Sequence, residues 1–246
     1  MEKSCSSCLF LFDFIFLIPL SWSNVYLLTA GRRAALIDTG LRRDREDLLA
    51  ALQSHGFSSN EIEAVYLTHG HCDHAGNAAY FAERGAKVYA HRQEAPYLGL
   101  PRRTYAGNFS QFLRRPLSAL AFWAGERLYP VERRTPDVLL GDGDCIDAPG
   151  GRLRVVACPG HSPGHIAFFR EEDAALFSGD AVMNIIPLRR PSGLHLPLRI
   201  FSSDWAQVKQ SVQTLAALQP KVLLSGHGAP LRRETASRLA EWADSL

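Results

Sequence analysis

The chain lacks a regular cysteine framework, a strong charge of one sign and an apolar run of membrane length. Its 246 residues include five cysteines, an odd number, and the formal net charge is only +2. We therefore expect free thiols in a reducing compartment. The near-neutral charge offers no electrostatic basis for a nucleic-acid partner. The longest apolar run, residues 8–20, is interrupted by Asp13 and is too short for a stable membrane span.

The composition that remains is that of an ordinary globular protein, 46% hydrophobic and 21% charged. A chain of this length forms one large domain or two small ones. It can bury a sufficient core without disulfides or structural metals. A metal bound by this chain is therefore expected to serve chemistry rather than folding.

The N-terminus allows two interpretations. Residues 1–3 followed by the apolar run look like a signal peptide, which would make the protein exported. Alternatively, residues 14–20 and 25–29 are the first strands of the fold. We prefer strands, because no small-x-small cleavage site follows the run. This gives a tail over residues 1–12, expected to be disordered, a single domain over residues 13–246, and a cytoplasmic protein.

Strand pairs and helices alternate along the rest of the chain, an α/β (α+β) pattern. Such a pattern favours two sheets with helices on the outside. The expected helices are residues 43–55, 75–84, 204–218 and 231–246. The further expected strands are residues 34–37, 64–67, 87–90, 138–140, 144–147, 153–157, 166–169, 174–177 and 221–224.

One segment, about residues 91–136, departs from this alternation. It is rich in arginine, proline and aromatic residues and shows no alternating strands. A segment this long without regular structure indicates an insertion, and such insertions often cover functional sites. Its aromatic residues either pack in the ordinary way or form an apolar pocket wall.

The densest chemical signal is the stretch THGHCDH at residues 68–74. His69, His71, Asp73 and His74 directly follow the apolar run 64–67, so they lie on a loop that leaves a buried strand. Three imidazoles and one carboxylate on such a short loop have little structural use. Their residue types are those that bind divalent metals.

Further polar side chains follow later strands: His161, Asp180 and His227, together with Asp38 after an earlier one. Loops at one edge of a sheet system can converge on a single site. With the histidine loop, the candidate ligands outnumber what one tetrahedral zinc takes, and they suit two divalent ions that share a bridging carboxylate.

These segments together resemble the metallo-beta-lactamase-fold hydrolases, specifically the glyoxalase II and lactonase-like branch. The matching segments are LIDTG at 36–40, THGHCDH at 68–74, PGHSPGH at 159–165, FSGD at 177–180 and SGHG at 225–228. The resemblance implies a four-layer αββα sandwich. It argues against a true beta-lactamase, which usually lacks a bridging aspartate where Asp180 stands.

The resemblance also implies a role for each matching residue. His69, His71 and His161 would hold one metal, and Asp73, His74 and His227 the second, with Asp180 bridging. Asp38 would orient the ligands, and Asp73 would also accept a proton during catalysis. His165 is expected to support the loop instead of binding metal, and His195 is open between a substrate contact and a packing role. The implied cofactors are two Zn²⁺ per chain, with iron or manganese as alternatives.

The expected activity follows from such a centre. We expect a zinc-dependent hydrolase whose dinuclear metal-bound hydroxide attacks an ester, thioester or lactone of a small molecule. The alternative from the same resemblance is a mononuclear iron oxidoreductase of the persulfide dioxygenase type. No nucleic-acid partner is expected for either activity.

Overall fold

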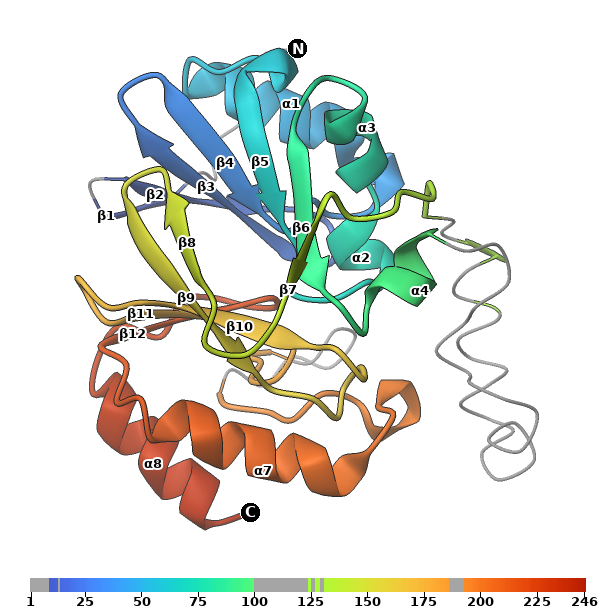
Figure 1. Cartoon of the computed structure of the whole chain (residues 1–246). Helices are drawn as coiled ribbons and strands as arrows, with labels where there is room; N and C mark the ends of the chain where they lie inside the picture. Colours follow the sequence, from blue (N-terminus) through green and yellow to red (C-terminus); the bar gives the residue numbers. More distant parts are fainter. Residues whose placement is uncertain (1–8, 13, 100–123, 125–126, 129–130, 186–192) are drawn as a thin grey trace.

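Two β-sheets form the centre of the molecule (Figure 1). The structure is a computed structural model that describes residues 9–12, 14–99, 124, 127–128, 131–185 and 193–246. The first sheet contains, in spatial order, β1 (Leu9–Phe12), β2 (Ile15–Pro19), β3 (Asn24–Ala30), β4 (Arg33–Ile37), β5 (Ile62–Tyr66), β6 (Lys87–His91) and β7 (Val138–Leu140). The second contains β12 (Val222–Ser225), β11 (Ala175–Gly179), β10 (Ile166–Arg170), β9 (Gly151–Ala157) and β8 (Cys145–Ala148). Strands β4 to β7 run parallel to one another, as do β11 and β12, whereas the other neighbouring strands are antiparallel.

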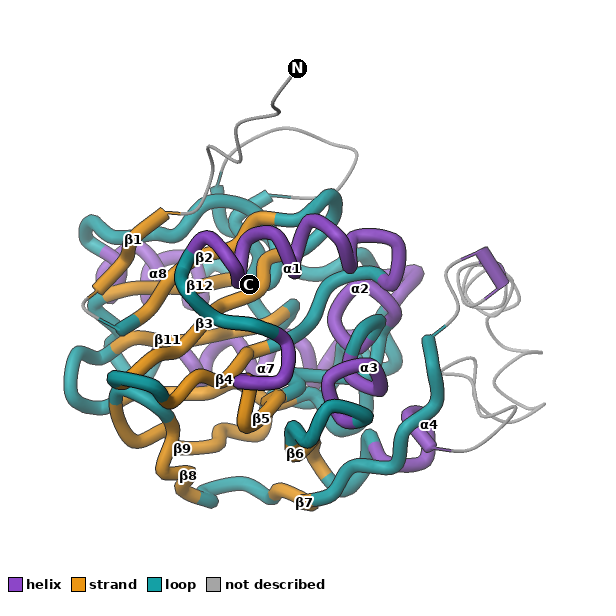
Figure 2. The backbone as a smooth tube through the Cα atoms, turned by 90° about the horizontal axis from the view of Figure 1, so that it is seen from above, coloured by secondary structure: helices purple, strands orange, loops and turns teal. Residues whose placement is uncertain are grey.

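Helices cover the outer face of each sheet. The first sheet carries α1 (Arg45–Ser54), α2 (Cys72–Ala75) and α3 (Ala78–Ala82), which lie over it when the molecule is seen from above (Figure 2). The second carries α7 (Trp205–Ala216) and α8 (Thr235–Asp244), below it in Figure 1. Short helices with described bounds are α4 (Ala95–Gly99), η1 (Arg42–Asp44), η2 (Ser59–Glu61) and η3 (Arg199–Phe201). The expected αββα sandwich is therefore confirmed.

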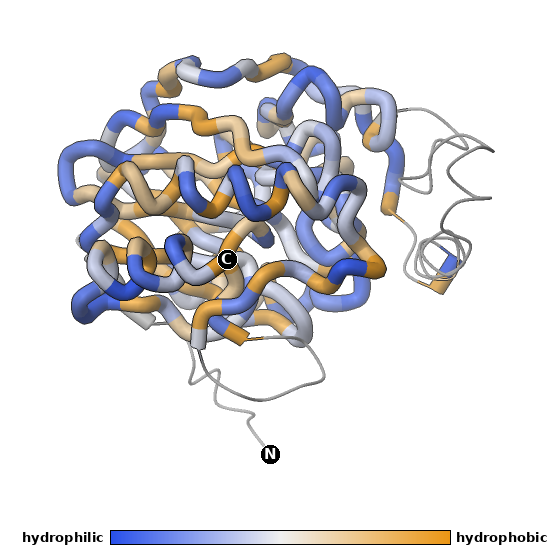
Figure 3. The backbone as a smooth tube through the Cα atoms, turned by 90° about the horizontal axis from the view of Figure 1, so that it is seen from below, coloured by the Kyte–Doolittle hydropathy of each residue, from blue (hydrophilic) through white to orange (hydrophobic). Residues whose placement is uncertain are grey.

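Apolar residues on both faces of the strands explain this layering. In β3, Tyr26 and Leu28 point into the core between the sheets, while Val25 and Leu27 pack toward the outer helices. Successive side chains of a strand point to opposite faces, so a continuous apolar run indicates burial on both sides. The outer helices are apolar on one side only, and hydrophilic residues alternate with apolar ones along them (Figure 3).

The parallel strands bring their carboxyl ends to one edge of the sandwich. Hydrogen bonds between the two sheets close this edge: Ile166 N–H donates to the Thr68 carbonyl at 3.0 Å, and Asn24 N–H donates to the Gly226 carbonyl at 2.8 Å. The loops after β4, β5, β11 and β12 and the β9–β10 turn therefore lie close together. These are the loops that carry the predicted ligands.

Two helices differ from the expectation because of tertiary contacts. The expected helix over 75–84 begins only at Ala78 as α3, because the shorter α2 ends at Ala75 and the Gly76 N–H donates to the Gly40 carbonyl at 3.0 Å, outside the helix. The expected helix over 231–246 begins only at Thr235, because Leu231 pairs with Leu223 across two backbone hydrogen bonds. The helix after Asp204 is confirmed, and its carboxylate accepts hydrogen bonds from two N–H groups of the first turn.

At the N-terminus the structure confirms the strand interpretation but moves the boundary. Residues Leu9–Phe12 form β1 and pair with β2, so the expected tail over 1–12 is too long. The sequence of this segment, LFLF, contains the aromatic residues that are enriched in strands. Residues 1–8 lie outside the described part of the chain. No helix among the described residues is long and apolar enough to cross a membrane.

The expected insertion at about 91–136 is described only at its two ends. It begins with α4, and its returning end is held to the domain because Arg134 N–H donates to the Leu98 carbonyl at 3.0 Å. Glu132 forms ion pairs with Arg42 at 3.0 Å and with Arg45 at 3.1 Å. The aromatic part over 100–123 lies outside the described residues, so the pocket-wall hypothesis stays a prediction.

Candidate metal centre

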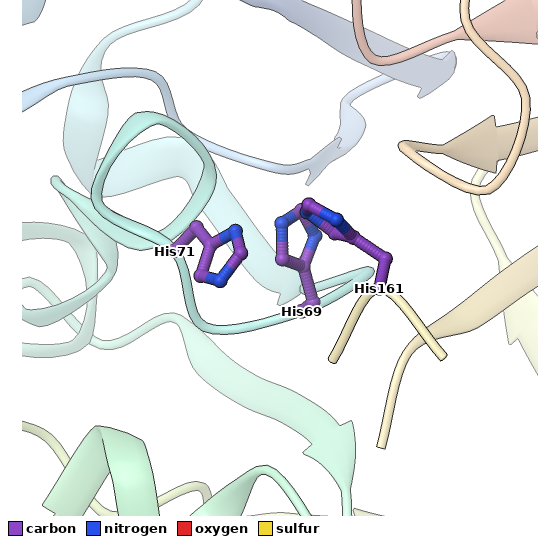
Figure 4. Close-up of side chains that lie close together, drawn as sticks. All are labelled: His69, His71 and His161. Atoms are coloured by element: carbon purple, nitrogen blue, oxygen red, sulfur yellow. The ribbon is translucent and has the colours of Figure 1, made fainter. Parts of the chain in front are cut away.

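Three imidazoles from two loops meet at the edge where the strands end (Figure 4). His69 and His71 come from the loop after β5, and His161 comes from the β9–β10 turn. One ring nitrogen from each lies within 4.8 Å of the others. The ring centroid of His161 lies 4.9 Å from that of His69 and 4.6 Å from that of His71. This is the arrangement that three nitrogen ligands of one metal ion require.

A second group lies directly beside the first and consists of Asp73, His74 and His227, again with ligand atoms within 4.8 Å of one another. Asp180 lies between the two groups. Its Oδ1 is 3.2 Å from Nε2 of both His74 and His227, whereas its Oδ2 is 3.4 Å from His161 Nε2. The structure thus brings all seven predicted ligands together, with one carboxylate facing both groups.

Asp38 orients the ligands of the histidine loop. Its Oδ2 lies 2.8 Å from His74 Nδ1 and also accepts a hydrogen bond from the Thr68 hydroxyl, and its Oδ1 accepts from the Thr68 N–H. The Thr68 hydroxyl lies 3.1 Å from His69 Nδ1. Because Nδ1 of His74 is held by this carboxylate, Nε2 is the ring nitrogen left to bind a metal.

His227 is oriented in the same way by the backbone. Its Nδ1 lies 2.6 Å from the carbonyl oxygen of Trp22, in the loop between β2 and β3. A carbonyl oxygen only accepts, so Nδ1 carries a proton, and Nε2 is the ring nitrogen left to bind a metal. That Nε2 faces Asp180 and Asp73.

Burial keeps the first three imidazoles neutral. It lowers the pKa of His69 and His161 well below the usual value, and neighbouring imidazoles lower both further. Burial also lowers the pKa of His71 to about 4, although nearby carboxylates oppose the shift. Neutral imidazole is the form that binds a metal, so the ring nitrogens are available as ligands at neutral pH.

The second group has the opposite electrostatics. Burial disfavours charge on His74 and His227, but carboxylates, Asp180 first among them, outweigh burial and raise both pKa values. Burial likewise disfavours ionisation of Asp180, but the same two imidazoles hold its pKa well below the usual range. Positive charge next to these carboxylates is therefore favoured, and a divalent cation supplies such charge.

The donor set fits a divalent metal on two further grounds. Nε2 of His69 is buried and has no hydrogen-bond partner among the described residues. Buried polar atoms of this kind require an explanation, and a bound ion is one. The backbone also approaches closely, since a Cβ on Gly226 would lie 2.5 Å from Asp180 Oδ1.

Comparison with known proteins decides the family. Residues 21–227 match the family model described as the metallo-beta-lactamase superfamily. The chain belongs to this superfamily. The match spans all of the loops that carry the clustered histidines and aspartates. Membership of this superfamily, together with the clusters, supports divalent metal binding and a metal-dependent hydrolase activity.

Relatives in the metallo-beta-lactamase superfamily cover most of the chain. The probable metallo-hydrolase YflN of Bacillus subtilis (strain 168) is 29% identical over 240 residues, which is 91% of this chain and 88% of YflN. A hydroxyacylglutathione hydrolase of Acidiphilium cryptum (strain JF-5) is 29% identical over 213 residues, 85% of this chain and 66% of that protein. The crystal structure of a metallo-beta-lactamase family protein from Thermus thermophilus superposes with a TM-score of 0.68 at 26% identity, covering 94% of this chain and 78% of that one.

Two histidines outside the ligand groups have different surroundings. His165 Nε2 accepts a hydrogen bond from the Asp180 N–H at 3.0 Å, and its Nδ1 lies 3.1 Å from Cys158 Sγ. His165 therefore supports the backbone of Asp180, in agreement with its expected role in the superfamily motif. His195 pairs through its backbone with Met183. A substrate contact, one of the two roles left open for His195, stays untested by this pairing.

Sequence reasoning missed one residue of this site, Glu94. Its fully buried carboxylate accepts hydrogen bonds from the loops that carry His69 and His161. The available signal was its position, because Glu94 comes three residues after the end of β6, much as the ligands follow their own strands. A lone carboxylate without metal-ligand spacing did not stand out.

Proposed function

We propose that this chain is a dinuclear zinc hydrolase that cleaves an ester, thioester or lactone bond in a small molecule. The observation that carries the proposal is the position of Asp180, with one oxygen toward His74 and His227 and the other toward His161. A carboxylate that faces two groups of nitrogen ligands suits a bridging position between two divalent ions. We place His69, His71 and His161 at the first ion and Asp73, His74 and His227 at the second.

The substrate class rests on the relatives and on charge. One relative acts on hydroxyacylglutathione, a thioester, and the chain aligns with it over 85% of its own length. The formal net charge of +2 provides little overall attraction for a nucleic acid. A small acyl compound is the substrate class that agrees with both observations.

Two divalent ions held by these residues would supply a hydroxide nucleophile at neutral pH and a Lewis acid for the substrate carbonyl. The side chains contribute orientation and proton transfer. Asp38 and the Trp22 carbonyl hold the rings of His74 and His227 in place. Asp73 is the proposed proton acceptor, because its side chain is 16% exposed whereas that of His74 is fully buried. An acceptor must be reachable from the substrate.

Metal analysis combined with a substrate panel tests this proposal. The protein is purified without added metal, its zinc, iron and manganese are counted, and the zinc- and iron-loaded forms are assayed on lactones, thioesters, phosphodiesters and beta-lactams. We expect two zinc ions per chain and turnover of lactones or thioesters. A single iron ion with oxygen consumption would support the iron oxidoreductase instead and refute the hydrolase.

A further inference from the structure

Glu94 connects the two loops that carry the first group of histidines. We propose that Glu94 is a positioning residue that holds these loops at the distance that metal binding requires. This proposal rests on the proposed function only because it requires that the two loops bind metal. It makes no assumption about the substrate. Glu94 follows β6, lies at the start of the segment 91–136, and is 0% exposed.

The carboxylate uses both oxygens, one for each loop. Oε2 accepts a hydrogen bond from the N–H of Gly70, which lies between His69 and His71, at 2.9 Å. Oε1 accepts from the Ser162 hydroxyl and from the Gly164 N–H, both at 2.7 Å. Ser162 directly follows His161. The Glu94 side chain therefore binds both the loop that carries His69 and His71 and the loop that carries His161.

The backbone around Glu94 is in direct contact with the second loop as well. A Cβ on Gly164 would lie 2.8 Å from the Glu94 nitrogen and 2.9 Å from His91 Nδ1. The turn is closed by the Glu94 N–H, which donates to the His91 carbonyl at 2.8 Å. The backbone of Glu94 therefore packs directly against the loop that carries His161, and its position is fixed, unlike that of a flexible surface side chain.

The donors facing Glu94 require a carboxylate rather than an amide. Gly70 and Gly164 present N–H groups, which only donate, and they face different oxygens. A glutamine has one accepting oxygen and one donating NH₂ group. In either orientation of the amide, its NH₂ group faces one of the two N–H groups. Glu94→Gln therefore leaves a buried donor without an acceptor, although its size is unchanged.

This role differs from that of the ligands, because Glu94 acts on their backbone. This role also differs from general support of the fold, because the two loops that Glu94 connects are those that carry His69, His71 and His161. A general packing residue such as Leu52, fully buried on α1 in the apolar cluster against the first sheet, contributes to stability but has no polar side-chain group to hold either loop. Metal binding thus separates the two roles.

The test compares Glu94→Gln and Glu94→Ala with the wild type and two controls. Glu61→Gln removes a carboxylate that also accepts from a backbone N–H and a serine hydroxyl, both of Ser58, but far from the centre in η2. Leu52→Ala reports on stability alone. Zn²⁺ affinity is measured by competition with a chelator, cobalt(II) spectra report ligand geometry, and amide exchange reports on Gly70 and Gly164.

We expect both Glu94 variants to bind Zn²⁺ at least about tenfold more weakly, because the loss of partners that orient metal ligands has effects of this size. Their cobalt(II) spectra should change, and the amides of Gly70 and Gly164 should exchange faster. Both controls should stay within about twofold of wild type in affinity. Glu94 variants that keep wild-type affinity and spectrum would overturn the proposal. If they fail to fold, Ser162→Ala, which removes one of the three donors, decides by the same measurements.

The outcome is independent of the proposed substrate class. A wild-type protein that binds zinc but turns over no ester, thioester or lactone would contradict the proposed hydrolase. The effect of Glu94 on zinc affinity would still be measured in that protein. Conversely, a Glu94 variant with wild-type zinc affinity and normal turnover would contradict the positioning role of Glu94 and would leave the proposed hydrolase intact.

Discussion

The carboxylate of Asp38 lies 2.8 Å from Nδ1 of His74, and the same carboxylate also binds the backbone and hydroxyl of Thr68. Asp38 adopts a left-handed backbone conformation, with φ of 59°, which a non-glycine residue rarely takes. Such conformations persist where surrounding contacts hold them, often at functional sites. Asp38 thus orients two consecutive parts of the ligand loop from a strained position.

We expect Asp38→Asn to weaken zinc binding at the second group by roughly 10- to 100-fold, because the ring of His74 loses its charged partner. Stoichiometry by metal analysis and affinity by chelator competition measure the effect. Asp144→Asn is the matched control, since Asp144 accepts from the Gly141 N–H in a turn away from the centre. Two tightly bound zinc ions in Asp38→Asn would contradict the orienting role.

Asp180→Ala should reduce the bound metal from two ions to one and lower kcat by on the order of a hundredfold or more, because the bridging carboxylate is removed. The fold should persist, since the side chain lies at the edge of the sandwich and not in its apolar core. Metal analysis, kinetics and thermal unfolding of the same preparation measure the three quantities. A variant with two metals and full turnover would refute the bridging assignment.

The sequence predicted the sheets and the ligands for the same physical reason. Apolar runs such as 64–67 mark buried strands, and polar residues directly after them must lie at a sheet edge. The break at Gly76 was not predictable, because it depends on the approach of the Gly40 carbonyl from a distant loop. Glu94 was not predictable either, because its partners Gly70 and Gly164 become neighbours only when the two sheets pack together.

His165 should make the metal-free protein less stable in acid. Burial lowers its pKa to about 3, against 6.5 for the ordinary group, so the unfolded chain binds the extra proton first as pH falls. Stability is thus fully present above about pH 6.5 and is lost progressively toward pH 3. One such group costs about 2 kcal/mol between pH 8 and pH 5.

Denaturant unfolding in the presence of a chelator, at pH 8 and pH 5, checks this for wild type and His165→Gln. The variant should lose about 2 kcal/mol less between the two pH values. His74 and His227, whose pKa values are raised, act in the opposite direction but do so in both proteins. Equal losses in the two proteins would show that His165 is not held neutral.

Gly226→Ala should abolish metal binding at the second group. A Cβ at this position would lie 2.5 Å from Asp180 Oδ1 and 2.7 Å from His74 Cε1, so both ligands would have to move. Gly31→Ala is the control: Gly31 has a φ of 60°, but nothing lies within 4 Å of its added Cβ. It should cost about 1 kcal/mol of stability and leave zinc binding unchanged. Zinc stoichiometry and thermal unfolding, measured together, separate the two effects. If Gly226→Ala binds zinc like Gly31→Ala, then the backbone at Gly226 does not determine the spacing between Asp180 and His74.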